Sequence, residues 1–277
     1  MKNVLIVTDF SPCSRNAAEY TINLLKDEIC CFYLMHVHKS STFTMDDLMS
    51  SATANVYQSI LKAEEQRLQN FKEALEQLSH NSKHEFHDIL DYNSFIEAID
   101  TIIEAKNIDL LVAGYNGVSN VAEIIFGSHT LSIIRRINCT TLVIPENVKF
   151  QPPKRMLLPL DAKDDIQSEA FTTLLHTAIN HDIEVHILRV YEKGKEGDCY
   201  DESYLMKHFK DVNYTYHVIQ HVPLHYVKTF YMQMHSIDMI GLIVQKESVF
   251  ERLFKHSSTT EISKALKRPL LVVHPKS

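Results

Sequence analysis

The feature that most constrains the fold is a repeat in which the second half of the chain restates the first. Residues 2–9 read KNVLIVTD and residues 154–161 read KRMLLPLD, so Lys and Asp recur at a constant offset of 152. Two later pairs match at an offset of 129, namely NIDLLVAG at 107–114 with SIDMIGLI at 236–243, and TTLVIP at 140–145 with PLLVVH at 269–274. The repeating unit is therefore a whole domain, and the second copy is shorter by the difference between the two offsets, which is 23 residues.

Each copy alternates short apolar runs with helical patterns, which is typical of a parallel sheet covered by helices. In the first copy the expected strands are 4–7, 30–37, 84–90, 109–113 and 141–144, and helical patterns lie at 12–25, 61–78, 94–105 and from 128. Ser11 and Pro12 offer a cap and a first-turn proline for the first helix. We therefore expect an α/β fold of two tandem doubly wound domains, each a five-stranded, mainly parallel sheet with helices on both faces.

The two copies meet at a proline-containing segment. Residues 148–153 end in Pro152 and Pro153, which stop both helix and strand. We expect a first domain at 1–147, a linker at 148–153 and a second, shorter domain at 154–277.

Composition and charge exclude several classes of partner. The chain is 45% hydrophobic and carries a net charge of -7, which offers no general attraction to nucleic acid or to an anionic membrane. The apolar run at the N-terminus is too short for a secretory signal, and no stretch approaches the roughly 20 apolar residues that span a bilayer. We expect a cytoplasmic protein that binds neither nucleic acid nor membrane.

The five cysteines include no C-x-x-C pair, so reduced thiols are expected.

Two of the sixteen histidines stand out. His36 and His38 alternate on an expected strand, so they share a face and could bind a metal together. Nothing in the local sequence supplies a third ligand. We therefore expect no metal site built from protein side chains.

Glycines mark a loop with a specific spacing. Only six glycines occur in the chain, and Gly114, Gly117 and Gly127, followed by Ser128, form the pattern G-x2-G-x9-G-S. The loop leaves the carboxyl end of an expected strand, where doubly wound sheets bind ligands. Glycines let backbone amides approach an anion, and the helix beginning near Ser128 offers free amides and a partial positive charge. This arrangement predicts a phosphate site, although the same glycines could serve only to shape a turn and a helix start.

On these residues the chain resembles the universal stress protein family, whose ATP-binding pattern is G-x2-G-x9-G-S/T. The first strand ending in Thr8 and Asp9, and the second-strand text from Leu34 to Val37, are also similar to the family. The resemblance covers essentially the entire chain as two fused copies. It implies an adenine nucleotide such as ATP as the ligand.

The resemblance also implies a role for each matching residue. Asp9, with Thr8 beside it, would accept hydrogen bonds from the nucleoside, and Val37 would offer backbone groups to the adenine edge. Gly114 and Gly117 would line the ribose and the first phosphates. The outer phosphates would be held by Gly127, Ser128, His129 and Thr130. No lysine lies between Gly114 and Thr130, so we expect modest affinity and a divalent ion such as Mg²⁺ on the phosphates.

The second copy departs from this pattern. At the offset of 129, Ile243, Lys246 and His256 replace the three glycines, while Ser257 matches Ser128 and Asp161 matches Asp9. Side chains in place of glycine would obstruct close approach of the backbone, so no nucleotide of the same kind is expected there. An anion site using Lys246, Lys255 and His256 is the alternative to a plain solvated surface.

The leading hypothesis is a nucleotide-binding regulatory protein of the stress response with one working site, in the N-terminal domain. One alternative is a slow ATP hydrolase, for which Asp9 and His129 are the candidate groups, and another is an interaction or scaffold protein without nucleotide. The sequence has neither the G-x4-G-K-[ST] nor the G-x-G-x-x-G signature. The resemblance further suggests that the last strands, near 140–145 and 269–274, pack the copies as an internal pseudo-dimer, and a homodimer of chains is a further expectation.

Overall fold

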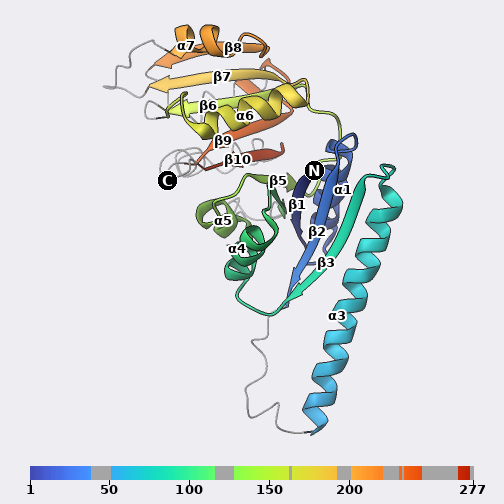
Figure 1. Ribbon diagram of the computed structural model, residues 1–277. Coiled ribbons are helices and arrows are strands. Elements are labelled where there is room, and N and C mark those ends of the chain that lie inside the picture. The colour runs from blue at the N-terminus through green and yellow to red at the C-terminus, as the bar shows by residue number, and fades with distance from the viewer. Residues whose placement is uncertain are drawn as a thin grey trace.

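The fold is a single ten-stranded sheet to which each half of the chain contributes five strands (Figure 1). The computed structural model describes residues 1–38, 51–115, 128–161, 164–191, 201–220, 231–232, 234–244 and 268–274. The strand order is β3-β2-β1-β4-β5-β10-β9-β6-β7-β8, so both halves place their first strand centrally and their last strand at the middle of the sheet.

The elements of the first half follow the alternation that the sequence predicts. They are β1 (Lys2–Val7), α1 (Pro12–Leu24), β2 (Cys30–Val37), α3 (Ser51–Leu78), β3 (His84–Asp91), α4 (Phe95–Lys106), β4 (Leu110–Tyr115), α5 (Ser128–Arg136) and β5 (Thr141–Pro145). Those of the second half are β6 (Arg155–Asp161), α6 (Glu169–Asn180), β7 (Glu184–Tyr191), α7 (Asp201–His208), β8 (Tyr214–Gln220), β9 (Met239–Ile243) and β10 (Leu270–Val273).

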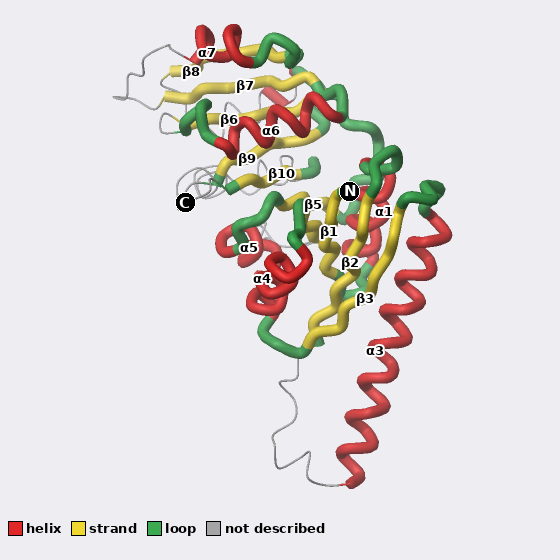
Figure 2. The backbone as a smooth tube through the Cα atoms, in the orientation of Figure 1, coloured by secondary structure: helices red, strands yellow, loops and turns green. Residues whose placement is uncertain are grey.

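The pairing of strands confirms the α/β prediction and its mainly parallel sheet. Within each half every pair of neighbouring strands is parallel. The two halves meet where β5 and β10 pair antiparallel, with Leu142 opposite Leu271. The strands of both halves therefore run on as one sheet (Figure 2) rather than as two separate ones.

Helices cover both faces of the sheet in the first half. On one face α1 and α3 pack with the cluster that contains Ile6 and Phe32, and the α3 residues Leu68, Phe71 and Leu75 are buried there. On the opposite face α4 and α5 form a second cluster. In the second half α6 and α7 contribute to the first cluster, and the helices expected on the other face fall largely outside the described residues.

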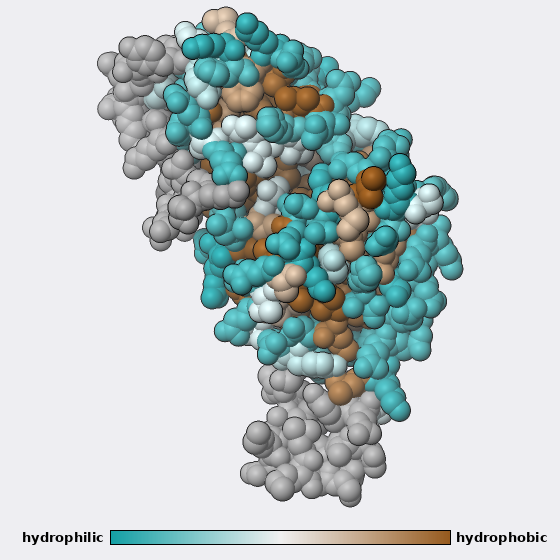
Figure 3. Space-filling model, in the orientation of Figure 1, coloured by the Kyte–Doolittle hydropathy of each residue, from teal (hydrophilic) through white to brown (hydrophobic). Residues whose placement is uncertain are grey.

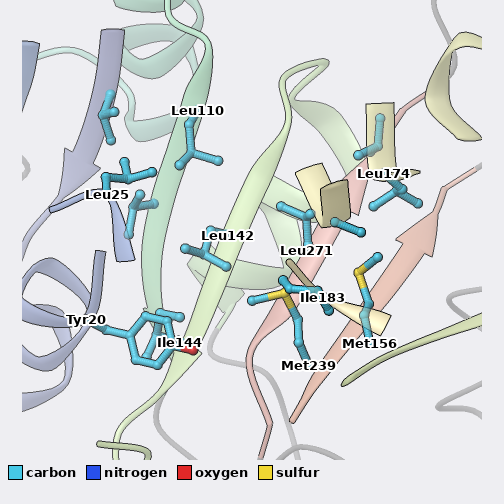
Figure 4. Close-up of a cluster of buried hydrophobic side chains, with 14 of the residues drawn as sticks. Tyr20, Leu25, Leu110, Leu142, Ile144, Met156, Leu174, Ile183, Met239 and Leu271 are labelled. Atoms are coloured by element: carbon cyan, nitrogen blue, oxygen red, sulfur yellow. The ribbon is translucent and has the colours of Figure 1, made fainter. Parts of the chain in front are cut away.

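The core continues across the boundary between the halves. Leu142 and Leu271 are both buried in one cluster with Ile144 of β5 and Met156 of β6 (Figure 4). The segment between β5 and β6 is also fixed, because Asn16 of α1 donates to the carbonyls of Pro145 (3.1 Å) and Val148 (2.9 Å). Burial at this seam therefore couples the two halves energetically.

The surface and the cysteines of the described residues match what the composition predicts. No helix in the described part of the chain is long and apolar enough to cross a membrane. Hydrophilic residues dominate the face in Figure 3, and apolar side chains form smaller patches between them. Cys13, Cys30, Cys31 and Cys139 are buried free thiols, as expected, and Cys199 lies outside the described residues.

Candidate functional site

The turn after β1 is a hydrogen-bonded unit that places Asp9. Thr8 Oγ1 accepts from the amide of Phe10 (3.0 Å) and bonds the hydroxyl of Ser14 (2.9 Å). Asp9 Oδ1 accepts from the amide of Ser11 (3.0 Å), and Ser11 Oγ in turn accepts from the amide of Ser14 to cap α1 (3.2 Å). The cap predicted at Ser11 is confirmed, and the turn holds the carboxylate of Asp9 at the start of a helix.

Asp9 is exposed whereas Thr8 is buried. Partial burial raises the pKa of Asp9, but hydrogen bonds from Ser11 and Ser14 outweigh it and lower the pKa below its ordinary value. The carboxylate is therefore ionised at neutral pH and has an oxygen available to accept hydrogen bonds from outside the protein.

Phe10 closes the turn in an unusual backbone conformation. Its φ of 62° lies in the left-handed region, which bulky residues rarely adopt. Its ring packs 4.5 Å from the ring of His36 and 6.2 Å from that of Phe71, measured between centroids. Such strain persists where surrounding contacts over-determine the conformation, and it is concentrated at functional sites.

Val37 ends β2 with its main chain open toward β1. Main-chain groups of successive strand residues point alternately to the two neighbouring strands. The amide of His38 donates to the carbonyl of Asp91 in β3 (2.9 Å), so the main-chain groups of Val37 point the other way. The pairing of β1 with β2 ends at Val7, opposite Met35. Val37 thus presents its amide and carbonyl beyond the paired end of β1.

Gly114 has a packing reason to be glycine. A Cβ at this position would lie 2.8 Å from both the carbonyl oxygen and the sulfur of Cys13 in α1. The first turn of α1 therefore approaches β4 as closely as it does because residue 114 lacks a side chain. This contact explains Gly114 without a ligand, so the residue by itself does not indicate a nucleotide.

The start of α5 lies against the end of β4. Thr130 is buried and its hydroxyl donates to the carbonyl of Gly114 (3.1 Å). His129 is exposed, and its ring meets that of Phe95 from α4 at 4.5 Å. Ser128 is the first residue of α5, as the sequence predicts. Gly117 and Gly127 lie outside the described residues.

The expected site residues thus converge on one edge of the sheet. Asp9, Val37 and Gly114 all lie at carboxyl ends of the adjacent strands β1, β2 and β4. In the order β3-β2-β1-β4-β5, β1 connects to β2 on one side, while its other neighbour β4 connects to β5 on the opposite side, so this edge is the switch point where doubly wound sheets bind ligands. His129 and Thr130 reach the same edge through α5.

The equivalent edge of the second half differs. Asp161 ends β6 as Asp9 follows β1, but Ile243 stands in the place of Gly114 and is a buried core residue at the end of β9. The anion-site candidates Lys246, Lys255, His256 and Ser257 lie outside the described residues.

One group near this edge escaped the sequence argument. Glu64 of α3 lies with His36 and His38, and its carboxylate comes within 4.8 Å of both imidazoles. The only signal in the sequence would have been the register of α3 on β2, which spacing along the chain does not supply.

Comparison with known proteins settles the family. The sequence model of the Universal stress protein family matches residues 1–145, which is more than half of the chain. This chain belongs to the universal stress protein family. A curated universal stress protein of Methanocaldococcus jannaschii is 28% identical over 149 residues, which are 53% of this chain and 84% of the relative.

Solved structures show the same fold over the whole chain. A universal stress protein from Archaeoglobus fulgidus superposes with a TM-score of 0.66 at 15% identity, covering 98% of each chain. A putative universal stress protein from Pseudomonas aeruginosa gives 0.55 at 9% identity and covers 99% of this chain and 94% of its own. At these identities the likeness establishes the fold, and function must come from the site.

Proposed function

We propose that the N-terminal half binds an adenine nucleotide, ATP in the first instance, and that the chain is a nucleotide-responsive regulator of the stress response. The observation that carries the proposal is the convergence of three different groups at the switch point of the first half. These are the ionised carboxylate of Asp9, the outward main chain of Val37 and the amino-terminal end of α5. Each suits a different part of a nucleotide.

The proposed roles follow from the chemistry of each group. Asp9 accepts hydrogen bonds from ribose hydroxyls, because its carboxylate is acceptor-only when ionised. Val37 offers one donor and one acceptor to the adenine edge. The amides at the start of α5, with Ser128 and the glycines 117 and 127, hold phosphate. No lysine lies between residues 114 and 130, so we propose that Mg²⁺ neutralises the phosphates in part.

The second half is proposed to act as a structural partner in an internal pseudo-dimer joined along β5 and β10. Ile243 occupies the position of Gly114 there, and its side chain belongs to the core. One nucleotide per chain is therefore proposed rather than two.

The test is denaturing extraction of the freshly purified chain with identification and counting of nucleotides, followed by calorimetric titration with ATP, ADP, AMP and cyclic AMP in magnesium buffer. One site per chain is expected. Asp9→Asn removes a charged acceptor, and a hydrogen bond to a charged group contributes about 1.5–3 kcal/mol, so affinity should fall by roughly tenfold to a hundredfold.

The matched control is Asp161→Asn, which makes the same change at the equivalent position of the second half. It should leave affinity unchanged. Two nucleotides per chain, or equal losses in both variants, would contradict the assignment to the first half. No bound nucleotide and no titration heat would instead support the interaction-protein alternative.

A further inference from the structure

A second, independent cluster of polar groups lies on the α3 side of β2. His36 belongs to β2 and His38 follows it, while Glu64 comes from α3, which runs alongside β2 and β3 (Figure 1). The Nε2 atom of His36 lies 3.6 Å from Oε2 of Glu64. One ligand atom from each of the three residues lies within 4.8 Å of the others.

The two ring nitrogens of His36 have different partners, and the hydrogen bond of Nδ1 determines whether Nε2, the nitrogen near Glu64, carries a lone pair. Nδ1 of His36 lies 2.8 Å from the main-chain carbonyl oxygen of Thr8. A carbonyl oxygen can only accept, so Nδ1 carries the proton and, in the neutral ring, Nε2 is an acceptor. When the ring is neutral, two acceptors, Nε2 of His36 and Oε2 of Glu64, therefore face one another.

The carboxylate of Glu64 lacks a partner that would balance it. The side chains of His36 and Glu64 are only 13% and 15% exposed. Among the described residues Oε2 of Glu64 is buried without a hydrogen-bond partner. Its other oxygen meets Arg67 at 3.4 Å, but that arginine side chain is 64% exposed, and such surface pairs contribute little. A buried carboxylate opposite a lone pair needs a cation between them.

The second half shows how the same position is balanced by a permanent charge. Val7 pairs with Met35, and Pro159, its equivalent at the offset of 152, pairs with Leu188. The next residue is His36 in the first half and Arg189 in the second. Arg189 is buried, and its Nε and Nη2 atoms both lie 2.6 Å from Oδ2 of Asp201 in α7. A helix carboxylate thus meets a fixed cation there, whereas the first half offers a metal ligand.

We propose that His36, His38 and Glu64 form a binding site for a divalent transition-metal ion, with Zn²⁺ as the best-suited ion. Two imidazole nitrogens and one carboxylate are a set of three protein ligands that zinc takes with a fourth position left open. The carbonyl of Thr8 orients the ring of His36 as an outer-shell acceptor does in such sites. Tetrahedral Zn–N and Zn–O bonds of about 2.0–2.2 Å place neighbouring ligand atoms roughly 3.4 Å apart, and the 3.6 Å between His36 Nε2 and Glu64 Oε2 is close to this spacing.

Such a site would depart from the sequence-based expectation that protein side chains provide no metal site. It is distinct from an ion held on nucleotide phosphates, because its ligands are side chains on β2 and α3. It does not rest on nucleotide binding, so the two proposals can fail separately. The competing occupant of the cluster is a proton on Nε2 of His36, which would make an ion pair with Glu64.

The chain offers a matched control. Cys31, Glu85 and His87 form a second group of the same size. There Glu85 and His87 have side chains that are 66% and 53% exposed, so solvent already satisfies them and no cation is required.

The experiment uses the full chain stripped with a chelator and titrated with Zn²⁺ against a chromophoric competitor, with Co²⁺ absorption as a report on the ligand geometry. One Zn²⁺ per chain is expected in the wild type. Glu64→Gln, which keeps the shape of the side chain, and His38→Ala should each weaken the affinity at least tenfold, while His87→Ala should not change it.

Circular dichroism in chelator checks that each variant is folded. If His38→Ala is unfolded, the Zn²⁺ affinity of Glu64→Gln alone tests the proposal. No stoichiometric Zn²⁺ binding by the wild type, wild-type affinity in Glu64→Gln, or a loss in His87→Ala instead would each overturn the proposal. The proton would then be the occupant of the cluster.

Discussion

The two halves of this chain share a strand order but differ at the carboxyl ends of their strands. In the first half only residues 8–11 separate β1 from α1, and α1 closes against Gly114. In the second half residues 162–168 separate β6 from α6, and the buried side chain of Ile243 stands in place of the glycine. The sheet therefore tolerates different groups at its carboxyl edge, because the core depends on the strands and the edge depends on the turns that follow them.

The two halves also differ in the contact between the second strand of each half and the helix that packs on it. Nε2 of His36 lies 3.6 Å from the carboxylate of Glu64 in the first half, whereas Asp201 contacts the guanidinium of Arg189 in the second. Tyr216 also donates to Asp201 (2.9 Å). The carboxylate is saturated by Arg189 and Tyr216 in the second half, and in the first half it is the one that we propose to bind a cation.

The largest expected effect comes from removing each helix carboxylate in metal-free buffer. Asp201→Asn removes the carboxylate that the buried Arg189 contacts through Nε and Nη2, and breaking a buried ion pair in this way should lower the free energy of unfolding by about 3 kcal/mol or more. Glu64→Gln removes an unbalanced charge and should leave the stability unchanged or slightly higher. Urea unfolding in chelator measures both, and similar losses in the two variants would mean that Glu64 is already paired by a proton on His36.

The next largest expected difference in stability is between substitutions of the glycines in β4 and β9, which are the fourth strands of the two halves. Gly114→Ala places a Cβ 2.8 Å from the main-chain carbonyl of Cys13, which cannot move without shifting α1, and overpacking of this kind costs about 1–3 kcal/mol. In β9, the Cβ of Gly241→Ala would lie 3.2 Å from the Met156 sulfur and 3.4 Å or more from Leu174 and Leu158, and these contacts are all with side chains that can adjust. The midpoint temperature of thermal unfolding should therefore fall more in Gly114→Ala than in Gly241→Ala. An equal fall in the two variants would show that the first turn of α1 is not closely packed on β4.

The helix caps separate stability from binding. Ser11 and Ser168 each accept from the amide three residues on, at 3.2 Å. Replacing either by alanine should cost about 1 kcal/mol of stability. Ser11 also positions the turn that carries Asp9, so only Ser11→Ala should weaken nucleotide binding in calorimetry. Equal affinities in the two variants would argue against a site at this turn.

The smallest expected effect is on how the free energy of unfolding depends on pH, to which histidines of the second half and Asp9 of the first contribute in different pH ranges. Burial lowers the pKa of His181, His186 and His274 below the ordinary 6.5, and all three belong to the second half. As the pH falls below 6.5 the unfolded chain binds these protons and the native chain resists them, so stability should decline there. Asp9, whose pKa is lowered, contributes stability that is lost only in a more acidic range, as the pH falls through its folded pKa.

Urea midpoints at pH 7.5 and 5.5 measure this decline. The triple variant with glutamine at positions 181, 186 and 274 should flatten it. A midpoint that rises on acidification would contradict the burial of these rings.

Much of the architecture could be predicted from the sequence because it rests on local patterns. The apolar runs of β1 and β4, the cap at Ser11 and the start of α5 at Ser128 all lie where the periodicity and the capping residues indicate. The family follows from the same motifs. What could not be predicted is the reason for Gly114, since the sequence indicated a phosphate contact and the structure adds the approach of Cys13.

The sequence by itself determined the repeat, the alternation of strands and helices, and the residues that reach the carboxyl edge of the sheet in the first half, because hydrophobic periodicity and glycine spacing are local properties of the chain. The resemblance already suggested that the last strands pack the two copies together. Only the tertiary structure decided that β5 and β10 pair antiparallel and make one continuous sheet, and that Glu64 meets His36 across 28 residues of sequence. Such contacts depend on how a helix is placed on a sheet, and that placement is set by the packing of many side chains at once.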